Sequence, residues 1–187
     1  MGIRRYLDVK NWYSDDVILL LMRLAGECGP EVNQDIYDIR RVTEENLADS
    51  QSFDAKKFLS VYKMFLEHGD VGVFGYINGR CAARCWGVVN PIDVTEGNKN
   101  LGLGRDAIFV HYVETDPSYR RKGLGKAVLG KLISDHQDRE MYVTINIDNI
   151  PSLKMHKCFG FKEIGIIRIK RRFMRVYTKI YRFDKSQ

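Results

Sequence analysis

The stretch TDPSYRRKGLGKAVLGKLI, residues 115–133, places a basic, glycine-rich turn directly between two regular elements. The preceding residues, AIFVHYVET at 107–115, have the composition of a strand, and residues 123–136 carry apolar side chains at helical spacing. The first turn of a helix exposes N–H groups that lack intrahelical partners, and the helix dipole adds partial positive charge there. Because glycine lets the backbone approach a ligand closely, this strand–turn–helix predicts an anion site that suits a pyrophosphate.

Two other phosphate-binding motifs do not fit this turn. A P-loop needs Gly-Lys followed by Ser or Thr, and here Ala127 follows Gly125-Lys126. A Rossmann fingerprint needs a third small residue at the position that Val128 occupies. On the turn alone, a solvated basic helix start without a ligand remains the alternative.

The rest of the chain predicts a mixed α/β domain built on one sheet. Asn78-Gly79 between two alternating segments indicates a tight hairpin. The glycine-containing segment 91–105 indicates a loop. Helices are predicted at 17–27, 53–68, 123–136 and 151–158, with a further helix start at 43–46, and strands at 35–42, 70–76, 80–89, 107–115, 141–147 and 164–183, the last with a turn near Lys170-Arg171.

Composition limits the function classes. The 187 residues are 44% apolar and 29% charged, which is typical of a globular domain, and we expect a single domain over 1–187. Thirty Lys and Arg against 24 Asp and Glu give a net charge of +6, a modest excess that favours an anionic partner without identifying one.

The longest apolar run, 17–25, contains Arg23 and is too short to span a bilayer, so we expect no membrane segment. Residues 1–10 are charged and no signal-peptide pattern follows, so we expect a cytoplasmic protein. The four cysteines form no C-x-x-C pair. They are therefore expected to be free thiols, and no metal site is predicted.

Two motifs in this order resemble the GNAT acetyltransferase superfamily. Arg120-x-x-Gly123-x-Gly125 is similar to the [Gln/Arg]-x-x-Gly-x-[Gly/Ala] pyrophosphate loop of that family. Asn149-x-x-Ser152-x-x-x-His156-x-x-x-Gly160-Phe161 is similar to its Asn-x-x-[Ala/Ser]-x-x-x-Tyr-x-x-x-Gly-Phe segment. The resemblance covers 107–165 closely, the hairpin at 70–89 fits the family's sheet order, and residues 1–34 look like an added helical N-terminal extension.

The resemblance implies a mixed, mostly antiparallel central sheet flanked by helices, with a splayed pair of central strands. It implies acetyl-CoA as cosubstrate and no metal. The pantetheine arm would lie between 113–115 and 143–147, where a main-chain N–H would polarise the thioester carbonyl. The implied cofactor-binding residues are Val113, Thr115, Arg120, Arg121, Lys122, Gly123, Leu124, Gly125, Lys126, Asn149 and Ser152.

Acetyl transfer needs a neutral amine, so a base or an ordered water must take a proton from the ammonium. Glu114, at the end of the central strand, is the predicted base, with His111 and water relays as alternatives. His156 replaces the family's Tyr and is the predicted acid for the leaving thiolate, unless solvent supplies that proton. Asn149 has a second interpretation as a helix N-cap.

The basic segment 168–175 indicates either a solvated sheet edge or a surface for an anionic acceptor, such as an aminosugar nucleotide or an acidic peptide. We expect acetyl transfer to the primary amine of a small molecule. The alternatives are a protein N-terminal or lysine acetyltransferase, a CoA-binding module without turnover, and, least favoured, a nucleic-acid binder. A homodimer and a covalent cysteine intermediate are further options, and the cysteine spacing does not support the latter.

Overall fold

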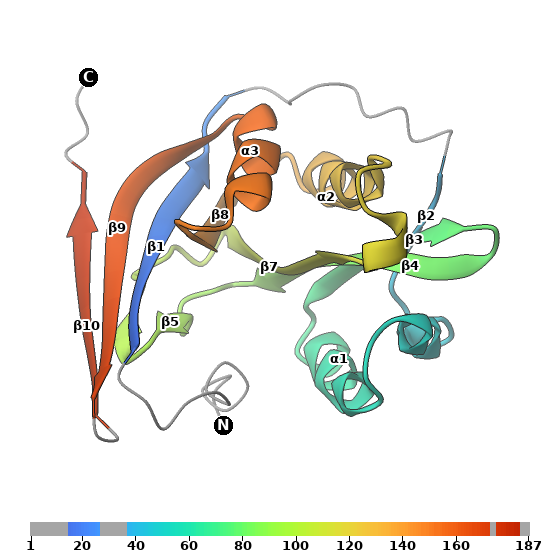
Figure 1. Cartoon of the computed structure of the whole chain (residues 1–187), viewed down its shortest axis with the longest axis horizontal. Coiled ribbons are helices and arrows are strands. Elements are labelled where there is room, and N and C mark those ends of the chain that lie inside the picture. The colour runs from blue at the N-terminus through green and yellow to red at the C-terminus, as the bar shows by residue number, and fades with distance from the viewer. Residues whose placement is uncertain (1–14, 27–36, 173–174, 184–187) are drawn as a thin grey trace.

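The structure is a computed structural model that describes residues 15–26, 37–172 and 175–183 (Figure 1). Strands and helices are interspersed along the chain. They are β1 (Asp15–Leu24), β2 (Asp38–Arg41), η3 (Leu47–Ser52), α1 (Lys57–Glu67), β3 (Val71–Ile77), β4 (Arg80–Val89), β5 (Thr95–Glu96), β6 (Lys99–Asn100), β7 (Ala107–Thr115), η4 (Pro117–Tyr119), α2 (Leu124–Asp135), β8 (Glu140–Asn146), α3 (Ile150–Cys158), β9 (Phe161–Arg172) and β10 (Arg175–Arg182).

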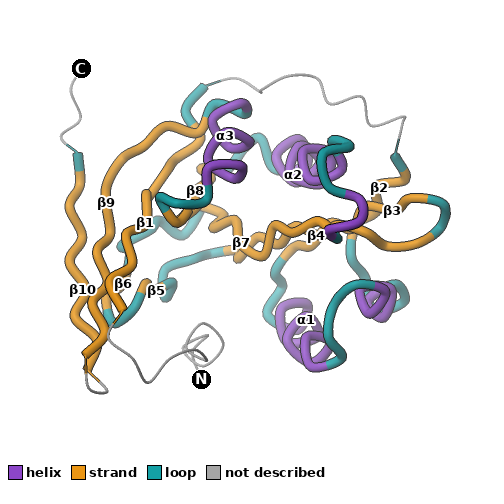
Figure 2. The backbone as a smooth tube through the Cα atoms, in the orientation of Figure 1, coloured by secondary structure: helices purple, strands orange, loops and turns teal. Residues whose placement is uncertain are grey.

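Eight strands form one sheet in the order β10-β9-β1-β8-β7-β4-β3-β2. Its neighbouring strands pair antiparallel except β7 and β8, which are parallel. Helices α2 and α3 cover one face of the sheet, and α1 covers the other (Figure 2). The predicted fold class, a mostly antiparallel mixed sheet flanked by helices, is confirmed.

Helix α2 is held tightly against the strands that lead to it. Leu124 and Val128 are almost completely buried on the sheet. They lie so close to Gly75 of β3 that a Cβ there would come within 2.9 Å of either side chain. On the opposite face, α1 packs Tyr62 and Phe65 against Trp86 of β4. The two layers fix both the start of α2 and the course of β4.

The helix predicted at 17–27 is wrong, because most of this segment is a strand inside the sheet. β1 pairs antiparallel with β8 on one side and with β9 on the other. Leu21 and Met22 are completely buried, one in the core beneath β5 and β6 and the other in the core beneath α2. A strand that is covered on both faces is apolar at consecutive positions, which removes the alternation expected of a half-exposed strand. The described part of 1–34 is therefore no helical extension.

Two smaller predictions need correction and one is confirmed. The turn expected near Lys170-Arg171 is not at these residues, since β9 continues through both to Arg172 and β10 begins at Arg175. The segment 91–105 contains the small β5–β6 hairpin and is not only a loop. The hairpin at Asn78-Gly79 is present, and both residues have positive φ, 52° and 74°, as a two-residue type I′ turn requires.

The internal position of β1 gives a stability prediction. We expect Leu21→Ala to lower the free energy of unfolding by about 2–5 kcal/mol, because it leaves a cavity at a fully buried position. Ile147→Ala, at a side chain that is 40% exposed, is the matched control and should change it by about 0.5 kcal/mol or less. Urea unfolding of the two variants makes the comparison. Equal small effects would contradict a structural role for β1.

Candidate active site

The parallel strands β7 and β8 part in the middle of the sheet. They pair over only four residues, from Ala107↔Glu140 to Val110↔Val143. Beyond that point β7 follows β4 and β8 follows β1. A cleft of about 1150 Å³ opens there, and its lining includes 110–113 of β7 and 143–146 of β8. The predicted splayed pair of strands is thus present.

A bulge turns the backbone of β7 at the cleft. Tyr112 has a φ of 51°, and the register with β4 shifts between Arg84 and Trp86. Past the bulge, the Asp116 N–H donates to the Ala82 carbonyl of β4. Strand alternation then directs the N–H groups of 113 and 115 away from β4, toward the side that β8 has left. Such bulges and unusual φ values are frequent at functional sites, where they redirect backbone groups.

The glycine-rich turn lies at the end of β7 and has the geometry of an anion site. Gly123 is the N-cap of α2, with a φ of 89°, and Arg121 has a φ of 61°. The Ala127 N–H donates to the Gly123 carbonyl, so the N–H groups of 124–126 precede the helical hydrogen-bond ladder. A Cβ on Gly125 would lie 2.9 Å from Thr115 Oγ1, which explains the need for glycine beside β7.

The positive side chains of this turn are solvent-exposed. Arg120, Arg121, Lys122 and Lys126 are all exposed around the start of α2. The Tyr37 hydroxyl donates to the Lys122 carbonyl and so ties the turn to the residue before β2. The sequence-predicted pyrophosphate loop is therefore folded as a turn that is open to solvent.

Helix α3 brings three predicted residues to the cleft: Asn149, Ser152 and His156. Asn149 Oδ1 accepts from the Ser152 N–H at 3.2 Å, so the N-cap interpretation of Asn149 is correct. His156 is 1% exposed, and its Nδ1 lies 2.9 Å from the Ser152 carbonyl oxygen. Since a carbonyl only accepts, Nδ1 carries the proton. Nε2 has no partner among the described residues.

Burial also lowers the pKa of His156, against the opposing effect of the Ser152 carbonyl. The environment therefore favours the neutral ring, whose Nε2 accepts a proton and does not donate one. The role of His156 as the acid stays a prediction, and these contacts give it no support.

Glu114 is held by a buried arginine. Arg84 Nη1 and Nη2 donate to Glu114 Oε2 at 2.9 and 2.8 Å. The Arg84 side chain is 3% exposed and also pairs with Asp54 at 3.1 Å. Its guanidinium lies over several rings, among them Phe53 and Tyr112. Glu114 is half-exposed and is not among the described residues that line the cleft. Its role as the base stays a prediction.

His111 does line the cleft, on the same side as α1. Its ring centroid is 4.9 Å from that of Phe65 and 5.0 Å from that of Tyr112. Burial, and to a lesser degree the charge of Arg84, lower the pKa of His111 to about 3. The imidazole is thus neutral at physiological pH. Its Nε2 is buried from solvent and has no hydrogen-bond partner among the described residues.

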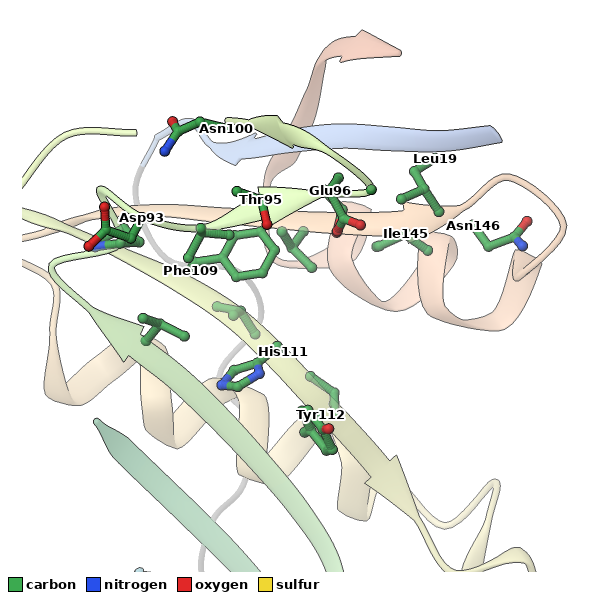
Figure 3. A pocket seen from close by; sticks show the side chains of 18 of the residues that line it. Leu19, Asp93, Thr95, Glu96, Asn100, Phe109, His111, Tyr112, Ile145 and Asn146 are labelled. Carbon is green, nitrogen blue, oxygen red and sulfur yellow. The ribbon is translucent and has the colours of Figure 1, made fainter. Parts of the chain in front are cut away.

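The cleft contains three carboxylates that the sequence analysis did not single out: Asp70, Asp93 and Glu96. Figure 3 shows Asp93 and Glu96 beside Phe109, on the wall formed by 91–100. The Thr144 hydroxyl donates to Glu96, and burial raises the pKa of Glu96 above its ordinary value. The available sequence signal was two acids in a glycine-containing segment between two central strands, but nothing in it showed that the segment folds back over the sheet.

Asp70 is the most buried of these acids, at 5% exposure. Its Oδ1 accepts from the Val89 N–H at 3.0 Å, and its Oδ2 has no partner among the described residues. Burial raises the pKa of Asp70 to about 6. An acid in this state destabilises the fold at neutral pH, because its charge is neither solvated nor paired.

The basic segment 168–175 contributes little to the cleft. Arg168 lies on the other face of β9 and pairs with Asp16 through hydrogen bonds of 3.0 and 2.6 Å. Of the basic residues in this segment, Arg171 alone lines the cleft. The structure therefore gives the expected anionic acceptor no support from these side chains.

The described cysteines do not support a covalent intermediate. Cys81 and Cys85 are buried, and burial raises the pKa of the Cys81 thiol to about 12. Cys158 is exposed, and none of the three lines the cleft. Cys28 lies outside the described residues. Within the described ranges, no group of three His, Cys, Asp or Glu side chains is arranged to hold a metal ion, and no helix is long and apolar enough to cross a membrane.

The family model described as Acetyltransferase (GNAT) family matches residues 33–161, more than half of the chain. Among curated proteins, the N-alpha-acetyltransferase RimI of Mycobacterium tuberculosis is 31% identical over 77 residues, which cover 40% of this chain and 47% of that protein. An uncharacterised protein of Mycobacterium leprae is 32% identical over 57 residues, which cover 30% of this chain and 16% of that protein. The chain thus spans less than half the length of these curated relatives.

Solved structures share the fold at low sequence identity. A protein from Novosphingobium aromaticivorans, described as an acetyltransferase from the GNAT family, superposes with a TM-score of 0.62 at 15% identity, over 90% of this chain and 66% of that one. The aminoglycoside N-acetyltransferase AAC(6')-Iy in complex with CoA gives 0.52 at 21% identity, over 67% of this chain and 92% of that one.

The unpaired carboxylate of Asp70 gives a prediction on pH and stability. Its pKa is about 6 in the fold against an ordinary 3.8, so between these values the folded chain holds a proton that the unfolded chain has released. Stability then falls as the pH rises through this range, by about 1.36 kcal/mol per pH unit and about 3 kcal/mol in all.

We expect Asp70→Asn to lack this decline, because the amide does not titrate. Urea unfolding of both proteins from pH 3.5 to pH 7.5 measures the difference between their free energies of unfolding. As the pH rises, the free energy of unfolding of the variant should increase relative to that of the wild type by about 3 kcal/mol. A difference that stays constant with pH would show that Asp70 has the same pKa in both states.

Proposed function

The chain belongs to the GNAT acetyltransferase family, and from this premise we propose that it transfers the acetyl group of acetyl-CoA to a primary amine by direct attack in a ternary complex. The observation that carries the proposal is the position of the exposed α2 turn at the end of β7, beside the point where β7 and β8 part. One strand thereby connects an anion site to an open backbone edge.

The turn suits the pyrophosphate of CoA. The N–H groups of 124–126 and the α2 dipole favour an anion, and the exposed side chains of Arg120, Lys122 and Lys126 add positive charge. Asn149 and Ser152 line the cleft on the same face of the sheet, where the pantetheine arm would pass. The residues that are present therefore fit this cosubstrate.

Strand alternation directs the N–H groups of 113 and 115 away from β4, and that of Val113, which lines the cleft, would donate to the thioester carbonyl oxygen. A fixed donor aimed at an oxygen that gains charge stabilises the transition state by a few kcal/mol. It needs no reorientation during the reaction, because the bulge at Tyr112 and the pairing of Glu114 with Arg84 hold this end of β7 in place.

The acceptor amine must lose a proton before it attacks the thioester carbon. Glu114, the base predicted from the sequence, lies at the end of β7 but outside the cleft lining, so in this role it would act only through water. The match to RimI, whose name describes an N-alpha-acetyltransferase, favours a second candidate function: acetylation of the N-terminal amine of a protein.

Gly123→Glu tests the anion site. Gly123 has a φ of 89°, which disfavours any side chain, and a carboxylate there would repel a pyrophosphate. We expect this variant to lose the rise in melting temperature that acetyl-CoA gives the wild-type protein. Differential scanning fluorimetry with and without acetyl-CoA measures this rise.

Gly79→Glu is the matched control, since Gly79 also has a positive φ of 74° and open space around it, but lies in the hairpin turn between β3 and β4. It should lower the melting temperature of the free protein and keep the acetyl-CoA effect. Full stabilisation of Gly123→Glu by acetyl-CoA would contradict the assignment of the turn.

A further inference from the structure

The segment 91–105 is fixed over the half of the sheet that contains β1, β9 and β10. Val94 and Leu101 are buried there, and the Leu101 N–H donates to the Val94 carbonyl at 2.9 Å. The turn of the β5–β6 hairpin rests on Thr178 of β10. The Asn98 N–H donates to Thr178 Oγ1 at 3.2 Å, and a Cβ on Gly97 would come within 2.3 Å of that oxygen. This hairpin therefore has a defined position over the sheet.

Glu96, immediately before that turn, reaches the point where the strands part. The Thr144 hydroxyl donates to its Oε1. Thr144 is the first residue of β8 beyond the last parallel pair, Val110↔Val143, and His111 is its counterpart on β7. In Figure 3 the side chains of Glu96 and His111 lie on opposite sides of the same cleft.

The hairpin and α2 approach this point from opposite faces of the sheet. Figure 1 shows β5 on the face that carries α1, while α2 and α3 lie on the other. A donor held at the start of α2 and an acceptor bound beside β5 would meet where β7 and β8 separate. Glu96 is thus positioned for the acceptor, whereas Glu114 lies outside the cleft lining.

We propose that Glu96 binds the ammonium group of the acceptor and removes its proton, and that the acceptor carries a second positive charge that Asp93 and Asp70 bind. This assignment rests on the proposed acetyl transfer and names the base and the substrate class for it.

Asp70 supplies evidence for a ligand that is independent of Glu96. It lines the cleft, is 5% exposed, and its Oδ2 has no partner among the described residues. A buried carboxylate with one oxygen that accepts no hydrogen bond lowers stability, and a cation supplied by a ligand would pair with it. Asp93 also lines the cleft and is exposed.

The sheet register gives the spacing between the two acidic positions, Glu96 beside Thr144 and His111, and Asp70 beside Val89. Asp70 is bonded to Val89, which pairs with Ile108, three residues before His111 on β7. At about 3.3 Å per residue, the two acidic positions are roughly 10 Å apart along the strand. The geometry therefore points to an extended acceptor with positive groups about that far apart.

The surroundings of Glu96 suit proton removal. The elements around it contribute Thr144 from β8, Leu19 from β1 and Arg171 from β9, and of these only Arg171 is charged. Burial raises the pKa of Glu96, and the Thr144 hydrogen bond and Arg171 partly oppose this rise. A carboxylate whose pKa is raised in this way accepts a proton more readily than an exposed glutamate.

The step balances as follows. Glu96 takes one proton from the ammonium, and the nitrogen lone pair then attacks the thioester carbon. The C–N bond forms, the C–S bond breaks, and the second proton of the nitrogen passes to the leaving thiolate. Glu96 afterwards releases its proton to solvent. The products are the acetylated amine, the free thiol of CoA and one proton.

Glu96→Gln tests the base. The amide still accepts from Thr144 but takes up no proton, so we expect kcat/KM to fall by about a hundredfold at pH 7. The deficit should shrink as the pH rises, because more of the amine is then neutral in solution. Thiol release from acetyl-CoA measures the rate, with 1,7-diaminoheptane as the probe amine. Stabilisation by acetyl-CoA confirms that the variant is folded and binds the donor.

Glu45→Gln is the matched control, since Glu45 is exposed and lies outside the cleft lining, and it should keep the wild-type rate. Wild-type activity of Glu96→Gln, or a deficit that does not change with pH, would overturn the assignment. Loss of the low-pH limb of the profile in Glu114→Gln but not in Glu96→Gln would assign the base to Glu114.

Three amines of one chain length test the substrate class: 1,7-diaminoheptane, heptylamine and 7-aminoheptanoate, whose far ends are positive, neutral and negative. We expect kcat/KM to fall in that order, by about tenfold at each step. Asp93→Asn should reduce the preference for the diamine over heptylamine.

An equal or greater rate with 7-aminoheptanoate would overturn the cationic class and restore the anionic acceptor. Thiol release by none of the three amines, with acetyl-CoA stabilising the wild-type protein, would remove this assignment while leaving the CoA site intact. Failure of acetyl-CoA to stabilise the wild-type protein would remove the proposed function itself.

Discussion

The separation of β7 from β8 after the pair Val110↔Val143 is the constraint on which the rest of the site depends. Backbone N–H and C=O groups that lose a partner inside a sheet must find another one. Beyond this pair β8 stays paired with β1 on one side, and β7 stays paired with β4 on one side. The other edge of β7 stays open, and a ligand with amide groups of its own, such as the pantetheine arm of CoA, complements that edge.

The sheet separates two kinds of electrostatic environment. On the α2 face, the helix start and four exposed basic side chains favour an anion. On the α1 face, Asp70, Asp93 and Glu96 make the other part of the cleft acidic. The net charge of +6 described neither part, because a sum over the chain does not show on which face each charge lies.

The sequence predicts the elements best where the pattern is local. The hairpin turn at Asn78-Gly79, the strand β7 and the start of α2 at Gly123 each follow from residues adjacent in the chain. The prediction for β1 was wrong because a strand that is buried on both faces shows no alternation of apolar and polar residues. Its sequence then resembles that of a short buried helix. The splayed strands came from the family resemblance and not from spacing.

The parts of the site that sequence could not place depend on contacts between distant segments. Glu114 meets Arg84 across two strands, and Glu96 reaches Thr144 only because the hairpin turn rests on Thr178. Side-chain identity also left the state of His156 open, since its tautomer depends on the Ser152 carbonyl of its own helix. Such states follow from burial and partners, which a linear pattern does not contain.

The most direct measurement is a crystal structure of the protein with acetyl-CoA. We expect the diphosphate on the N–H groups at the start of α2, and the thioester carbonyl oxygen within hydrogen-bond distance of an N–H of 113–115. A diphosphate bound elsewhere, or a cleft closed by pairing of β7 with β8 beyond Val143, would contradict this expectation.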